Sequence, residues 1–379
     1  MNKKNEVKFL YLSQEDMIKA GVLNMERCVN VIEEGFKLLS NGDYLAGGPS
    51  EHDHGMRIWF PSKARGENMP IKGPDRRFMA MVAYLGGRFD ICGTKWYGSN
   101  VENREERGLP RSILLVILND PVSGAPLALM DGNLISEMRT GAVPGIAAKY
   151  LAKENSKVLG IIGAGVISRF CFMSLVSVLK NLEEVKVFDI NERKAEDFCE
   201  YIKSETNIQN VVKVDSLEKS ISGSDVISIA AAGENLPLVK DKWLKEGSCL
   251  ILVGGVQPNK ELYLGSNIVV DDWKMHKRWI IENKERKEVD PLDDSIEGWP
   301  VIYINKLIDE KKLKETEIID IGDIITGKKI GRKNNSQKYL FISGGLPMED
   351  LAWGYEIYKN ALKSGIGKEL VLWKQPYFV

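Results

Sequence analysis

One stretch near the middle of the chain decides the fold: residues 159–168 read LGIIGAGVIS. An apolar strand runs into Gly163-Ala164-Gly165, and an apolar helix follows at once. In such a loop the first glycine makes the tight turn and the second lets the backbone approach a pyrophosphate, which then faces the helix N-terminus. The third glycine position holds Ser168, which is still small enough for close packing. The stretch predicts a dinucleotide-binding strand–loop–helix unit.

The next expected strand supports this prediction. Residues 185–189 read VKVFD and end in Asp189, 24 residues after Gly165. A carboxylate there can bind both ribose hydroxyls and repels a 2′-phosphate, so NAD is favoured over NADP, although nearby Arg193 would soften the preference. The simpler alternative is a sheet without nucleotide, in which Asp189 only caps a helix. If a nucleotide binds, the further residues expected to contact it are Ala164, Val166, Ile167, Ala231 and Gly254.

Working outward, the chain divides into two kinds of pattern. After residue 157, short apolar strands alternate with helical segments, which indicates a parallel, doubly wound sheet. Before residue 136, apolar runs are separated by turn residues, with DPVSG at 120–124, and indicate an antiparallel sheet with a hairpin. The expected fold is therefore α/β.

Composition limits the class of protein. The 379 residues exceed the roughly 100–200 of one typical domain, so at least two domains are expected. The 52 basic and 53 acidic side chains nearly cancel, so nothing points to nucleic acid or a membrane surface as partner. There is no signal-peptide pattern, no run of about 18 apolar residues and no C-x-x-C pair among the five cysteines. We therefore expect a cytoplasmic enzyme without a metal site.

Several further motifs carry a resemblance to a known family. Residues 93–95 read GTK, residues 136–142 read SEMRTGA, and residues 343–352 read SGGLPMEDLA. Together with the glycine loop and its late position in the chain, this ordered set resembles the ornithine cyclodeaminase/mu-crystallin family from about residue 8 to about residue 370. Within it, the chain resembles a longer subgroup whose members are often called the second subunit of tyramine oxidase. Residues 47–75 and 273–313 look longer than in compact members.

The resemblance implies a domain arrangement. A Rossmann domain with a doubly wound parallel sheet, residues 138–324, would be inserted in a split α+β domain. Residues 1–137 together with 325–379 would form that split domain, which binds substrate and pairs with a second copy. A homodimer with a small amino or imino acid as substrate is therefore expected.

The resemblance also implies a substrate site. Arg57, Lys95 and Arg139 match the family positions that hold the substrate's carboxylate and reactive nitrogen. A guanidinium binds a carboxylate through two parallel hydrogen bonds, and a partly desolvated lysine can transfer a proton. Arg139, with Thr140 beside it, can instead bind cofactor phosphate or form a surface ion pair. His52 and His54 are expected to lie in a solvated polar loop.

One position departs from the family pattern. Cyclodeaminases carry an aspartate just after the glycines of a late Rossmann strand, whereas this chain has Val256, which cannot accept a proton. Three functions remain open. The first, which we favour, is an NAD-dependent oxidoreductase acting on the C–N bond of an amino or imino acid. The second is an ammonia-lyase that recycles NAD in each turnover, and the third is a non-catalytic binding protein. Val256 argues against the second, and Lys95 and Arg139 argue against the third.

Overall fold

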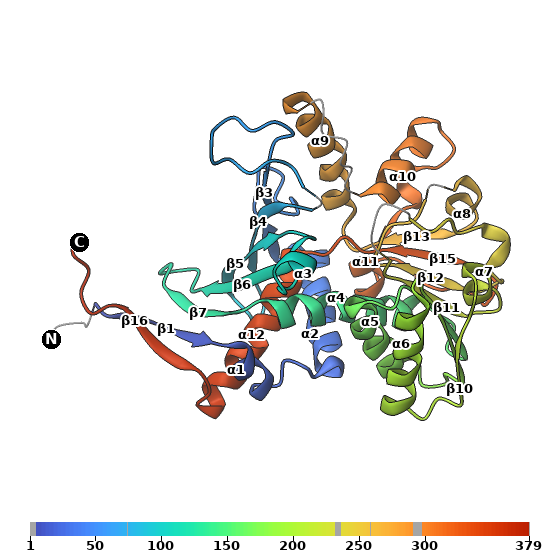
Figure 1. Cartoon of the computed structure of the whole chain (residues 1–379), viewed down its shortest axis with the longest axis horizontal. Helices are drawn as coiled ribbons and strands as arrows, with labels where there is room; N and C mark the ends of the chain where they lie inside the picture. Colours follow the sequence, from blue (N-terminus) through green and yellow to red (C-terminus); the bar gives the residue numbers. More distant parts are fainter. Residues whose placement is uncertain (1–4, 74, 232–235, 258, 291–297, 379) are drawn as a thin grey trace.

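Two eight-stranded sheets organise the part of the chain that the computed structural model describes, which is residues 5–73, 75–231, 236–257, 259–290 and 298–378 (Figure 1). The first sheet contains β1 (Val7–Leu12), β2 (Tyr44–Ala46), β3 (Met56–Trp59), β4 (Arg77–Leu85), β5 (Ile91–Ser99), β6 (Ser112–Asn119), β7 (Pro126–Asp131) and β16 (Lys368–Trp373). The second contains β8 (Val158–Ile162), β9 (Glu184–Phe188), β10 (Asn210–Lys213), β11 (Val226–Ile229), β12 (Cys249–Leu252), β13 (Asn267–Val270), β14 (Ile319–Asp320) and β15 (Tyr339–Ile342).

The first sheet has the strand order β16-β1-β7-β6-β5-β4-β2, with β3 also paired to β4. Strands β4 to β7 form the expected antiparallel meander. Side chains alternate along these strands, so Met79 and Met81 of β4 are buried while Phe78 and Val82 are exposed. The buried face packs against α12 (Pro347–Ser364), which contacts β4, β5 and β6.

The second sheet has the order β10-β9-β8-β11-β12-β15-β13-β14, and its described strands all pair in parallel. The order β10-β9-β8-β11-β12 is the 3-2-1-4-5 order of a Rossmann fold. The predicted α/β fold with a doubly wound parallel sheet is therefore confirmed.

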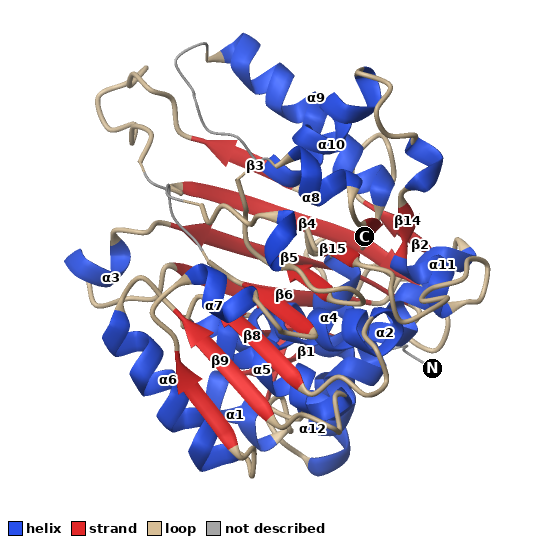
Figure 2. Cartoon of the chain, turned by 90° about the vertical axis from the view of Figure 1, so that its right-hand side faces the viewer, coloured by secondary structure: helices blue, strands red, loops and turns tan. Residues whose placement is uncertain are grey.

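The helices complete the two layers. They are α1 (Gln14–Lys19), α2 (Met25–Asn41), α3 (Asn103–Glu106), α4 (Asn133–Leu151), α5 (Val166–Val178), α6 (Glu192–Glu205), α7 (Leu217–Ile221), α8 (Lys260–Leu264), α9 (Trp273–Val289), α10 (Trp299–Asp309), α11 (Ile321–Ile325) and α12. Both views place α9 beside β3, so a helix that follows the second sheet reaches the edge of the first (Figure 1, Figure 2). The described part of residues 273–313 is largely helical, and residues 291–297 lie outside the described residues.

The expected domain boundaries need correction. Strand β15 pairs with β12 and β13, so the chain leaves the second sheet only after Ile342 and not at residue 325. The expected junction at residues 137 and 138 falls inside α4, which contacts both α2 and α5. Helix α4 approaches α5 closely because a side chain at Gly141 would collide with the backbone of Phe170. A helix that packs so tightly on both sides cannot be a flexible domain junction.

Candidate active site

The glycine loop has the geometry of a phosphate-binding turn. Gly163 has a φ of +90°, which only glycine adopts easily, and it packs against the backbone of Ala230 and Ala231. Gly165 precedes the first turn of α5, and no atom lies within 4 Å of the place that a side chain at Gly165 would take. The N-terminus of α5 therefore has space in front of it for an anionic group.

The other predicted cofactor residues gather along the same edge. The Oδ2 of Asp189 accepts a hydrogen bond from the amide of Ala164 at 2.7 Å, which joins the end of β9 to the loop. A side chain at Gly254 would collide with the backbone of Ala231, so the ends of β11 and β12 also meet here. Val166 and Ile167 open α5, and Arg193 is exposed in the first turn of α6. These residues fit an adenine dinucleotide that lies across the carboxyl ends of the strands.

A buried charge cluster, formed by Lys95, Arg139, Glu349 and Asp350, lies between α4, α12 and β5. The Lys95 Nζ donates to Asp350 Oδ2 at 2.8 Å, and the Arg139 Nε donates to Asp350 Oδ1 at 3.2 Å. The Arg139 Nη1 donates to Glu349 at 2.7 Å. Thr140 is half-buried on α4 next to Arg139. One carboxylate thus bridges the two predicted substrate-binding cations, and Arg139 is not a surface residue.

Burial shifts the protonation equilibria of this cluster. Burial, together with the positive charge of Arg139, lowers the pKa of Lys95 to about 8, although Asp350 opposes the change. Burial would also lower the pKa of Arg139, but the charges of Asp350 and Glu349 outweigh it and raise that pKa. Burial raises the pKa of Glu349 to about 7 against the opposing charge of Arg139. Lys95 can therefore gain and lose a proton near neutral pH, as proton transfer requires.

Arg57 lies on β3, where two partners hold its guanidinium. Its Nη1 donates to Glu282 of α9 at 2.6 Å, and its Nη2 lies 2.6 Å from Nδ1 of His54. Burial, and then the positive charges of Arg57, Lys95 and Arg139, lower the pKa of His54 well below its usual value. The three predicted cations therefore surround one neutral imidazole. The expectation of a solvated polar loop is wrong for His54.

The glycine turn before α12 fixes this arrangement. The buried Asp271, at the end of β13, accepts hydrogen bonds from the amides of Gly344 and Gly345 at 2.5 and 2.8 Å, and from His276 Nε2 at 2.6 Å. Gly345 has a φ of +83°, and a side chain there would collide with Nη1 of Arg139. Asp271 of the second sheet therefore positions the turn that leads to Glu349.

Sequence reasoning missed Glu349, Asp350 and His54 as members of the site. A signal existed: a lysine in an apolar strand needs a buried partner, and Glu349-Asp350 are adjacent acids at the start of an apolar helix. Val256 is 1% exposed and packs in an apolar cluster under the second sheet. It supplies no polar group to the site.

Comparison with known proteins agrees with this geometry. The sequence profile of the ornithine cyclodeaminase/mu-crystallin family matches residues 15–365. The chain belongs to this family. Among its relatives are N-((2S)-2-amino-2-carboxyethyl)-L-glutamate dehydrogenase of Staphylococcus aureus, 28% identical over 96% of this chain and 98% of that protein, and alanine dehydrogenase of Archaeoglobus fulgidus, 30% identical over 95% and 98%.

Solved structures of the family have the same architecture. Δ1-pyrroline-2-carboxylate reductase of Thermococcus litoralis, in complex with NADH and L-proline, has a TM-score of 0.76 at 30% identity and covers 95% of this chain and 99% of its own. An archaeal alanine dehydrogenase dimer with bound NAD has a TM-score of 0.77 at 27% identity, covering 97% and 100%. In the described part of this chain no helix is long and apolar enough to cross a bilayer, and no group of metal-ligating side chains converges.

Proposed function

We propose that this chain is an NAD-dependent oxidoreductase that acts on the C–N bond of an amino or imino acid. The observation that carries the proposal is the setting of Lys95: a buried amine with a pKa of about 8, bridged by Asp350 to Arg139. Helix α4, which bears Arg139, packs on α5, whose N-terminus follows the glycine loop. Relatives named for alanine and for pyrroline-2-carboxylate support the same substrate class.

The roles of the residues follow from their contacts. Bound NADH would supply the hydride that reduces the imine carbon. Lys95 gives its proton to the imine nitrogen during reduction and takes a proton back during oxidation. Arg139 has Nε and Nη1 engaged by acids, while Nη2 makes no hydrogen bond within the described part of the chain. That edge, together with Arg57, is suited to the substrate's carboxylate.

Val256 disfavours the lyase alternative. Ammonia release by the family's cyclodeaminases uses a carboxylate at this place, and here an apolar side chain is buried in the core. Net hydride transfer needs no such carboxylate, because Lys95 alone supplies the proton.

The test removes Lys95. Lys95→Ala should abolish NADH-dependent reduction of Δ1-pyrroline-2-carboxylate while the dissociation constant for NADH stays nearly unchanged, because the glycine loop lies in the other sheet. Lys95→Arg should also fail, since a guanidinium keeps its proton. Full activity in either variant would contradict the proposal. A native protein that binds NADH but neither oxidises amino acids nor reduces imines would favour the binding-protein alternative.

We also propose that the chain is a cytoplasmic homodimer. The outer face of the first sheet exposes four large apolar side chains in neighbouring rows, which are Phe78, Trp96, Ile113 and Leu115. Such a contiguous apolar surface is costly in water and is suited to a self-complementary contact. The archaeal relative whose structure is a dimer supports the same assembly. Five unpaired cysteines support a reducing compartment.

A further inference from the structure

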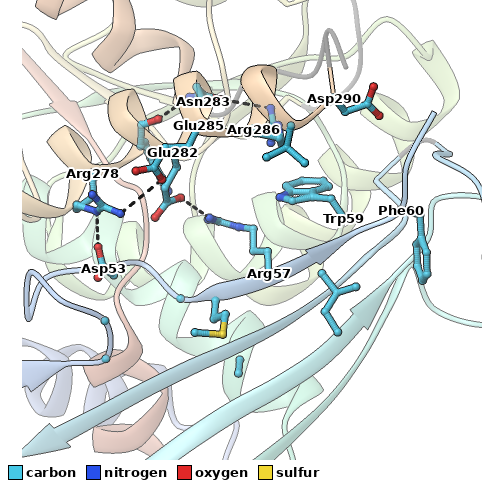
Figure 3. Close-up of a pocket in the computed structure, with 18 of the residues that line it drawn as sticks. Asp53, Arg57, Trp59, Phe60, Arg278, Glu282, Asn283, Glu285, Arg286 and Asp290 are labelled. Atoms are coloured by element: carbon cyan, nitrogen blue, oxygen red, sulfur yellow. Dashed lines mark hydrogen bonds and ion pairs between the residues drawn. The ribbon is translucent and has the colours of Figure 1, made fainter. Parts of the chain in front are cut away.

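A cavity of about 720 Å³ lies between α9 and β3 with the loop before it (Figure 3). The segments that look long in sequence, residues 47–75 and 273–313, supply most of its wall. Its volume lies within the roughly 300–1,000 Å³ of pockets for drug-sized ligands. At about 30 Å³ per water molecule, it equals some two dozen waters. The methyl group of alanine or the ring of proline would leave most of it unfilled.

The cavity adjoins the buried charge cluster. Arg57 lines it and also contacts His54, the imidazole whose pKa responds to Lys95 and Arg139. Trp279 lines it too, and a side chain at Gly344 would lie 2.7 Å from the Trp279 ring. The next residue along the chain, Gly345, packs on Arg139. A substrate held at Arg139 and Lys95 can therefore extend past Trp279 into this space.

The charged groups of the wall are already matched to one another. Arg57 pairs with Glu282 at 2.6 Å, and Arg278 pairs with Asp53 at 2.6 Å (Figure 3). These ion pairs fasten the loop before β3 to α9. They satisfy the guanidinium groups inside the protein, so the wall does not need a charged ligand group.

The rest of the wall is aromatic and aliphatic. The indole of Trp59 points into the space below α9 (Figure 3), with the guanidinium groups of Arg286 and Arg77 lying 4.7 and 5.2 Å from its ring centre. Two cation–π contacts hold this ring rigidly. Further apolar side chains that line the cavity are Met56, Ile58, Phe60, Val289 and Trp279. A rigid surface of this kind suits a bulky apolar group.

We propose that this cavity receives the side chain of the amino or imino acid, and that this side chain is bulky and apolar, such as that of phenylalanine. The inference rests on the proposed function and deepens it, because it assigns the substrate class of the same site. The reaction is the one proposed above: hydride adds to the imine carbon, and the nitrogen takes a proton.

The test compares three 2-oxo acids in reductive amination with ammonia and NADH, followed by absorbance: phenylpyruvate, pyruvate and 2-oxoglutarate. The kcat/KM for phenylpyruvate should exceed that for pyruvate at least about ten-fold, since even one buried methylene is worth about 10-fold or more. A preference for pyruvate or for 2-oxoglutarate would overturn the inference while leaving C–N oxidoreduction intact. If the three acids and Δ1-pyrroline-2-carboxylate all fail to react, the proposed function is refuted and this inference with it.

Two variants locate the preference in the cavity. Trp59→Ala should lower the ratio of the two kcat/KM values, phenylpyruvate to pyruvate, several-fold. Val289→Trp should do the same by narrowing the space, and Val289 is 72% exposed, so this variant does not disturb the core. Trp373→Ala is the matched control, because Trp373 lies on β16, far from α9 (Figure 1), and the ratio should not change. An unchanged ratio in both cavity variants would overturn the inference.

Discussion

Asp350→Asn is the most informative single change, because it removes a charge without changing the shape of the bridge between Lys95 and Arg139. Imine reduction needs Lys95 as an ammonium, so kcat/KM in the native protein should fall as the pH rises through about 8, the pKa of Lys95. Asp350 stabilises that ammonium through a contact of 2.8 Å. Its loss lowers the pKa of Lys95 further, and the decline in activity moves to lower pH.

The magnitude follows from the geometry. Two unit charges about 4 Å apart interact by about 4 kcal/mol at an effective dielectric constant of about 20, and one pH unit corresponds to about 1.4 kcal/mol. The decline should therefore move by about one to three pH units. Because the pair is buried, the variant should also lose about 3–5 kcal/mol of unfolding free energy.

The assay is the pH dependence of kcat/KM for imine reduction at saturating NADH. Glu356→Gln is the matched control, since Glu356 also lies on α12 but pairs with Arg27 and Arg88. Asp350→Glu keeps the charge and should restore much of the native profile, which separates an electrostatic role from a purely structural one. An Asp350→Asn protein that folds, binds NADH and declines at the native pH would refute the assignment of the proton donor to Lys95.

Three further outcomes are expected. Asp189→Ser should weaken NAD binding by about 10- to 100-fold and narrow its advantage over NADP, since a hydrogen bond to a charged group contributes about 1.5–3 kcal/mol; titration of both cofactors measures this. Gly345→Ala should lower kcat/KM by at least about ten-fold, since the αL conformation alone costs about 1–2 kcal/mol and its Cβ displaces Arg139, while the NADH dissociation constant stays constant. Ile113→Arg should convert a dimer into monomers in light scattering, because it places a charge in the exposed apolar face; a native protein that is already monomeric would contradict the proposed assembly.

The sequence by itself determined those parts of the fold that rest on local patterns. The glycine loop, the following acid and the alternation of strand and helix specify the Rossmann order, because turn geometry and apolar periodicity act over a few residues. The antiparallel meander was predictable for the same reason. Lys95 could also be singled out locally, since a lysine in an apolar strand needs a functional or paired role.

Only the tertiary structure decided the contacts between distant segments. Strand β16 pairs with β1 from the other end of the chain, and β15 inserts between β12 and β13, although no local signal specifies either partner. The partnership of Lys95 with Asp350 spans 255 residues, and that of Arg57 with Glu282 spans 225. Side-chain chemistry says which groups need partners, but the choice of partner depends on packing across the whole molecule. The charge cluster and the cavity beside it therefore emerge only when the two sheets and α9 come together.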